Sequence, residues 1–311
     1  MQPARPMDRM PSPSATLKTY HSDSNLSLAS ENKLAHPLVA VRSEPSLQRT
    51  NTNITESDQA LWHKNPKEYF AVRKNFFHLS TEKINHYIAT QQDIHQLKPI
   101  FLPATNIVHE TDFTQPTMKS CNITSLMSAL DDLLSANCPN YPTTNALEKF
   151  KYWNSNILSP DEHNKLFATK EARDKLGIKP GLDLKELTSL ANRLLSRFNI
   201  PWTATIHSTA DLSLDSFIEK IQQSKENGTR IIANLCAMQL FGRTENFGHY
   251  VHIDKIKISA SNQVFCHPIM HASYRYPPDL YIPASDIYQA MVPEVDGTPR
   301  GIITLEKNKA S

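Results

Sequence analysis

Three side chains that could together carry out acyl transfer stand far apart in the sequence. Cys121 opens a stretch with helical periodicity, Gln115 precedes it by six residues, and His249 follows a glycine at the head of a strand-like stretch. A thiolate can attack a carbonyl carbon, an imidazole can accept and return the proton, and a side-chain amide can hold the oxyanion. Each residue type alone is common in structural positions. The ordered set of three predicts a cysteine-nucleophile enzyme.

The position of Cys121 predicts an activated thiol. Apolar residues follow it at steps of three and four, which is the period of an amphipathic helix. They are Ile123, Leu126, Met127, Leu130, Leu133 and Leu134. A thiol at a helix N-terminus faces unpaired backbone N–H groups and the positive end of the helix dipole. We therefore expect the thiolate of Cys121 to be favoured.

The elements that must position these residues form two groups along the chain. A second helix is indicated from Asp183, with Glu186 as its capping-box partner, and a third begins near Ser213. Strands are indicated at 230–236, 250–258 and 264–266. Helices followed by strands predict an α+β fold with a helical N-terminal part packed on an antiparallel sheet.

The first 57 residues differ from the rest. They are rich in Ser, Pro, Asn and Thr, and Tyr20 is their only aromatic residue. Such a stretch buries too little apolar surface to offset its ordering entropy, so 1–57 is predicted to be a disordered tail and 58–311 the folded domain. The tail could also serve as a translocation segment of an exported effector, although nothing in it is diagnostic.

Composition limits the partners. Lys and Arg total 33 against 31 Asp and Glu, which favours a small-molecule or peptide substrate over nucleic acid or an anionic membrane. The four cysteines form no CxxC pair, so we expect no disulfide scaffold and no metal site, and read Cys138, Cys236 and Cys266 as core or incidental thiols. Without an apolar run of about 18–20 residues, no membrane span is expected. A cytoplasmic location is the default, and a homodimer is compatible with the sequence.

Several segments resemble the phytochelatin synthases, glutathione γ-glutamylcysteinyltransferases with a papain-like fold. The similarity extends over about 76–305. The similar segments, which occur in the order found in that family, are Thr114–Cys121 with Thr124 and Ser125, Gly181–Leu187, Leu214–Phe217, Ile231–Leu235, Gly248–His249, Tyr274–Pro278, Ile287–Met291 and Arg300–Gly301.

The resemblance implies an activity and a set of site residues. Cys121 would cleave the Cys–Gly bond of glutathione through a γ-glutamylcysteinyl thioester, with Gln115 at the oxyanion and His249 as acid and base. No cofactor would be bound tightly, and a heavy-metal ion would enter as a metal–thiolate substrate. Arg300 would bind a substrate carboxylate, and Asn234 and Tyr276 would line the site. The alternatives are a solvated surface arginine for Arg300 and purely structural roles for the other two.

Two departures from the family pattern leave other functions open. His271 stands where the family has its triad Asp, and a neutral imidazole supplies no negative charge to stabilise the imidazolium. His267 and Asp254 are the other candidates to orient His249. Asn122 replaces the glycine after the nucleophile. A cysteine peptidase or deamidase acting on another peptide or protein, or a non-catalytic binding module, therefore remains an alternative.

Overall fold

The structure is a computed structural model that describes residues 68, 80–102, 120–143, 146–240, 242, 246, 248–269, 280–295 and 297–308. All of them belong to one unit, Asn51–Ser311. The helices are α3 (Thr81–Ile94), α4 (Cys121–Asn137), α5 (Ala146–Asn156), α6 (Pro160–Phe167), α7 (Lys170–Leu176), α8 (Leu184–Arg197), α9 (Leu214–Asn227), α10 (Ala237–Leu240) and α11 (Ala284–Met291). The strands are β1 (Ile100–Phe101), β2 (Trp202–Ser208), β3 (Arg230–Cys236), β4 (Gly248–Ile258), β5 (Val264–Ile269), β6 (Ile282–Pro283) and β7 (Gly301–Lys307).

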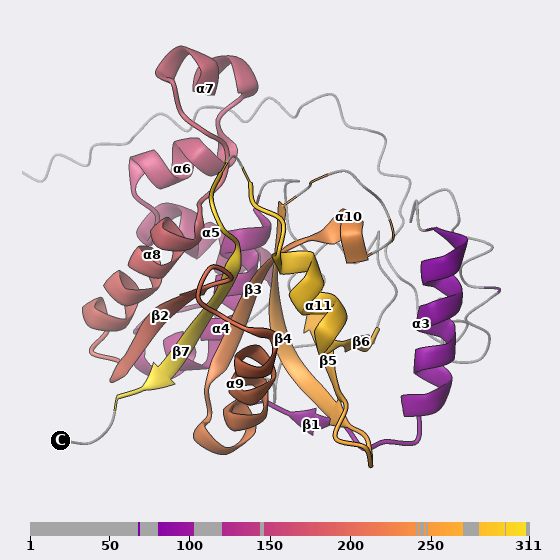
Figure 1. The fold of residues 1–311 in the computed structure, drawn as a ribbon. Helices are drawn as coiled ribbons and strands as arrows, with labels where there is room; N and C mark the ends of the chain where they lie inside the picture. The colour runs from indigo at the N-terminus through magenta and orange to yellow at the C-terminus, as the bar shows by residue number, and fades with distance from the viewer. Residues whose placement is uncertain are drawn as a thin grey trace, which may run out of the picture. The chain divides into compact units, whose positions relative to one another are not determined.

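A single antiparallel sheet organises the described residues (Figure 1). Its strand order is β2-β7-β3-β4-β5-β6, and β1 also pairs with β4. Every pairing between these strands is antiparallel. The long strand β4 therefore lies beside β3 along its first half and beside β5 and β1 along its second half.

Helices cover both faces of the sheet, and the alternation of side chains along the strands explains why. In β3, Ile231, Ala233 and Leu235 belong to a core that includes residues of α3, α9 and α11. Ile232, between them, belongs to a second core with residues of α4, α5 and α8. Successive side chains of a strand point to opposite faces, so one apolar strand serves both cores. Figure 1 shows α9 and α11 in front of the sheet and α4 and α8 on its other side.

Local capping chemistry sets the helix boundaries that the sequence predicts. The Asp183 side chain accepts from the backbone of Glu186 at 2.8 Å, and the Glu186 side chain accepts from the Asp183 backbone at 3.1 Å. At α9 the Ser213 hydroxyl accepts a hydrogen bond from the backbone N–H of Ser216 at 3.1 Å. Side-chain caps satisfy backbone N–H groups that have no partner within the helix. Both predicted helix starts are confirmed.

The α+β class, with helices packed on an antiparallel sheet, is confirmed. The three predicted strands appear as β3, β4 and β5, although β4 begins two residues earlier and β5 ends three residues later than expected. The proposed tail 1–57 lies outside the described residues. Among the helices described, none is both long and apolar enough to cross a membrane.

Candidate functional site

Cys121 is the first residue of α4, as the periodicity predicts. The helix begins with two hydrogen bonds to the carbonyl of Ser120, one from the backbone N–H of Thr124 at 2.9 Å and one from its hydroxyl at 2.8 Å. The Cys121 side chain is buried and belongs to the core between α4, α8 and the sheet. The nucleophile candidate is thus held on a packed helix.

Burial sets the protonation state of this thiol. It raises the pKa of Cys121 above its usual value, although the backbone N–H groups of Tyr250, Asn122 and Cys121 itself act in the opposite direction. The N–H groups at the helix terminus act in favour of the thiolate, as expected, but removing the charge from water outweighs them. The expectation that the thiolate itself is favoured is therefore wrong. At neutral pH the resting side chain is a neutral thiol that needs a proton acceptor.

The candidate acceptor, His249, is the second residue of β4 and is buried. The sulfur of Cys121 lies against the backbone N–H of Tyr250, the next residue along the strand. Gly248, on the other side of His249, lies close to Arg300: a Cβ atom there would come within 3.2 Å of the guanidinium Nη1. The start of α4 therefore meets β4 at the Tyr250 backbone, one residue after His249.

Gln115, His271 and Tyr276 lie outside the described residues. The two other candidates to orient His249 are placed elsewhere. Asp254 follows His249 by five residues of β4, which is about 16 Å along a strand. Its carboxylate forms a hydrogen bond with the imidazole of His267 on β5. The suggestion that either residue orients His249 is therefore wrong.

Arg300 is buried, with 1% of its surface exposed, so the alternative of a solvated surface arginine is wrong. Its guanidinium donates four hydrogen bonds to protein oxygens. The acceptors are Asn234 Oδ1 at 3.0 Å, the Leu235 carbonyl at 3.1 Å, Asn246 Oδ1 at 2.5 Å and the Pro293 carbonyl at 2.8 Å. A substrate carboxylate would have to compete with these partners. The geometry favours a bracing role, which joins the ends of β3, β7 and the segment before β4.

Asn122, which replaces the glycine of the similar family, has a structural task. Its side chain is buried, donates to the Leu182 carbonyl at 3.1 Å and accepts from the Ile123 backbone at 2.7 Å. It therefore ties the start of α4 to the segment that leads into α8. Leu182 also lines a recess of about 360 Å³ whose other walls come from α6 and α8, namely Asp161, Glu162, Lys165, Lys185, Glu186 and Ser189.

Tyr250 is a site residue that the sequence analysis does not single out. It faces the α4 side of the sheet, directly opposite Asn234 on β3. Burial, then the charges of Cys121 and Asp183, raise its pKa, while Arg300 and Asn234 act in the opposite direction. The phenol oxygen thus lies among these groups. The signal available in the sequence was its position, since the residue after His249 must face away from Val251 and towards the cysteine helix.

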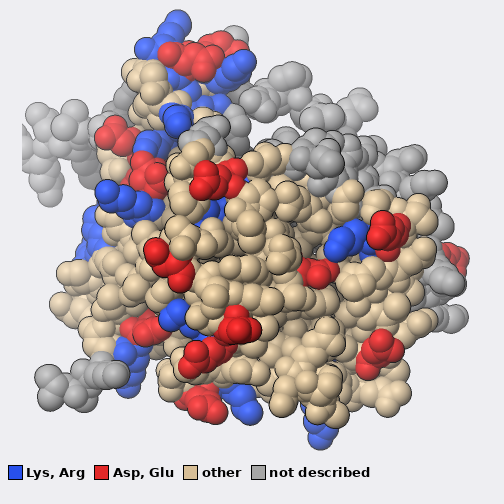
Figure 2. Space-filling model, in the orientation of Figure 1, with Lys and Arg blue, Asp and Glu red and all other residues tan. Residues whose placement is uncertain are grey.

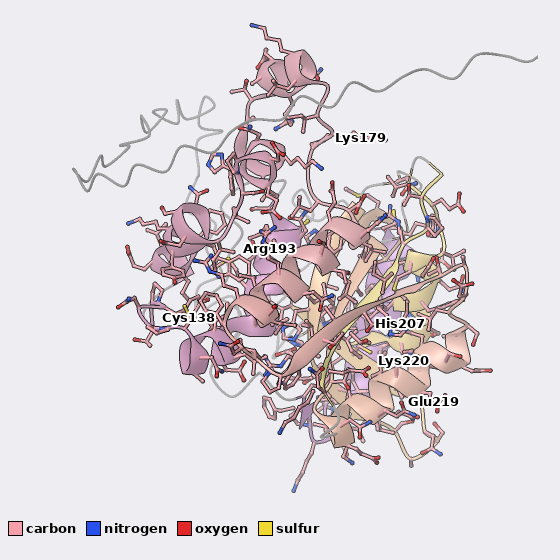
Figure 3. All side chains as sticks on the ribbon, turned by 90° about the vertical axis from the view of Figure 1, so that its left-hand side faces the viewer. Cys138, Lys179, Arg193, His207, Glu219 and Lys220 are labelled. Carbon is pink, nitrogen blue, oxygen red and sulfur yellow. The ribbon has the colours of Figure 1, made fainter. Side chains whose placement is uncertain are left out.

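The remaining cysteines are all buried. Cys138, on the side of the molecule shown in Figure 3, has its sulfur 3.1 Å from the Tyr152 hydroxyl. Cys266 lies within the core and its pKa is raised by burial. The interpretation of these residues as core thiols is confirmed. No group of three potential metal ligands occurs within the part of the chain that the structure describes.

Surface charge is mixed on the face shown in Figure 2, where basic and acidic side chains of the described residues are interspersed. Neither a scan against protein-family models nor a search of the curated proteins finds a match for this chain.

Proposed function

We propose that this protein is a cysteine-nucleophile acyltransferase or hydrolase with a papain-like arrangement of helix and sheet, acting on a γ-glutamylcysteinyl peptide such as glutathione. One observation carries the proposal: Cys121 opens a helix packed on an antiparallel sheet, with its sulfur at the backbone of the residue that follows His249. A thiol on a helix and an imidazole on an adjoining strand are the two halves of a cysteine–histidine site. His249 lies opposite Leu235 on β3, so the proposal requires its ring to turn from the Leu235 side of β4 to the sulfur.

The proposed chemistry proceeds in two steps. His249 accepts the thiol proton as the Cys121 sulfur attacks the carbonyl carbon between Cys and Gly. The C–N bond then breaks, the amine of glycine leaves with that proton, and a γ-glutamylcysteinyl thioester remains. The amino group of a second glutathione, or water, attacks the thioester and restores the thiol. Gln115 and the Cys121 backbone N–H are the proposed donors to the oxyanion.

The raised pKa of Cys121 supports a general-base role for His249. A resting thiolate would need no base, but a buried neutral thiol attacks slowly unless its proton is removed during the reaction. The mechanism therefore depends on His249 more strongly than it would for an exposed cysteine at a helix terminus.

The test is to incubate the purified protein with glutathione, with and without Cd²⁺ or Zn²⁺, and to measure released glycine by mass spectrometry. We expect glycine from the wild-type protein and from Cys138→Ala, the matched control for a buried thiol outside the site. Cys121→Ala and His249→Ala should release none above background. Equal glycine release by Cys121→Ala and the wild-type protein would refute the proposal.

A second candidate is a peptidase or deamidase that acts on a different peptide. The engagement of Arg300 by protein oxygens favours it, because a guanidinium already bound in this way holds a substrate carboxylate less readily. Release of ammonia or of a new peptide N-terminus from a peptide library, lost in Cys121→Ala, would distinguish this candidate from glutathione cleavage.

A further inference from the structure

We infer that the Tyr250 hydroxyl is a substrate-contacting hydrogen-bond donor, which binds a carbonyl or carboxylate oxygen of the acyl group carried by Cys121. The inference deepens the proposed function and rests on it. It assigns a role to a residue that lies beside the candidate nucleophile and takes no part in the steps described above.

The first support is the place of Tyr250. Its backbone N–H lies at the Cys121 sulfur, and its ring packs in the core between α4, α8 and the sheet. The charges of Cys121, Asp183 and Arg300 all act on the phenol, which locates its oxygen among the start of α4, the start of α8 and the start of β7. The hydroxyl therefore lies on the side of the sheet that faces the start of α4, which carries Cys121.

The second support is the state of the hydroxyl. The residue is only 6% exposed, and within the described residues no group lies in hydrogen-bond geometry with its oxygen. A buried hydroxyl without a hydrogen bond is destabilising, so such groups are uncommon in folded proteins and call for an explanation. An oxygen acceptor supplied by a substrate would satisfy this donor.

The third support is the orientation of the Asn234 side-chain amide, which a hydrogen bond from Arg300 sets. Arg300 Nη1 donates to Asn234 Oδ1 at 3.0 Å, so the Asn234 NH₂ group is directed away from the guanidinium. Asn234 and Tyr250 are cross-strand partners on the same face, and the Asn234 amide acts to lower the pKa of the Tyr250 phenol. This amide lies near the phenol oxygen but outside hydrogen-bond geometry, so the hydroxyl proton remains available to a ligand. Arg300 and Asn234 are positioning residues in this arrangement.

The test compares Tyr250→Phe with Tyr288→Phe in the full-length protein. Tyr288 is the matched control, because its hydroxyl already donates to the Leu212 carbonyl at 2.8 Å on the opposite side of the sheet. With glutathione as the probe, Tyr250→Phe should lower kcat/KM for glycine release by about 10- to 100-fold, while Tyr288→Phe should leave it unchanged.

Thermal unfolding supplies the readout that separates contact with substrate from a structural role. Removing an unsatisfied buried hydroxyl is neutral or stabilising, so Tyr250→Phe should keep or raise the Tm, whereas Tyr288→Phe should lower it. An unchanged kcat/KM, or a fall in Tm like that of Tyr288→Phe, would overturn the role of Tyr250 and leave the proposed function intact. Absence of glycine release from the wild-type protein would overturn both.

Discussion

The buried imidazole of His252 should make the folded state less stable as the pH falls from about 6.5 to about 4. His252 lies on β4 beneath α4, with its Nδ1 atom 2.9 Å from the hydroxyl of Ser128. Burial lowers its pKa from 6.5 to about 4 despite the opposing charge of Asp254, and the Arg230 charge adds to the lowering. The folded protein therefore keeps His252 neutral over a range in which the unfolded chain binds a proton.

The size and the sign of the effect follow from this difference. Above pH 6.5 neither state is protonated at His252, and below pH 4 both are, so the loss of stability is confined to the interval between these values. The full difference corresponds to about 3 kcal/mol of unfolding free energy. Burial acts to raise the pKa of Asp254, but His267, with Lys255 and His252, outweighs it and the pKa is lowered, so the stability that Asp254 contributes is lost only at more acidic pH. The two contributions are therefore separable.

Urea unfolding at pH 7, 5.5 and 4.5 measures the effect. The wild-type protein should lose about 2.5 kcal/mol more between pH 7 and 4.5 than His252→Asn, which retains a polar partner for Ser128 but does not titrate. The exposed His95, replaced by Asn, is the control and should reproduce the wild-type slope. If the curves of the wild-type protein and His252→Asn run parallel, burial does not keep this imidazole neutral and the reasoning is wrong.

Two further predictions concern stability. Gly301→Ala should lower the free energy of unfolding by about 3 kcal/mol or more, because a Cβ atom there would overlap a backbone carbonyl of the facing strand β2. Gly177→Ala should lower it by about 1 kcal/mol, because Gly177 has a left-handed backbone at the C-cap of α7 but open space around it. Chemical unfolding of both variants measures the difference. Asp131→Asn should cost about 3–5 kcal/mol, because it removes the carboxylate charge that pairs with the buried ammonium of Lys149, 2.7 Å away. The exposed Glu148→Gln should change stability by less than about 0.5 kcal/mol, and a similar cost for the two acid-to-amide changes would contradict the burial argument.

The parts of the fold that depend on local chemistry could be predicted from the sequence. The helices α8 and α9 follow from capping residues and apolar periodicity, and β3 from a short apolar run. The strands β2 and β7 could not be predicted in the same way. Exposed and half-buried side chains obscure the alternation of β2, and the role of β7 depends on its placement between β2 and β3. That placement is a property of the tertiary structure.

The same division applies to the candidate site. Periodicity predicts that Cys121 begins a helix, but its pKa depends on the strand that covers it. The Arg-Gly pair suggests that Arg300 binds a substrate carboxylate. In the structure, however, Arg300 donates hydrogen bonds to protein oxygens that include the carbonyls of Leu235 and Pro293, and no local sequence pattern connects these residues with it. Packing therefore decides what these residue types can do.

The most direct test of the central claim is the rate at which iodoacetamide alkylates Cys121, with the modified residue mapped by mass spectrometry. The rate is compared between the wild-type protein and the His249→Ala variant, after circular dichroism has shown that the two have the same fold. Since burial alone raises the pKa of this thiol, rapid alkylation near pH 7 requires a neighbouring base. We expect Cys121 to react faster than Cys138 in the wild-type protein and at least about tenfold more slowly in His249→Ala. Equal rates for Cys121 in the two proteins would show that His249 does not act on the sulfur, and the proposed enzyme would be refuted.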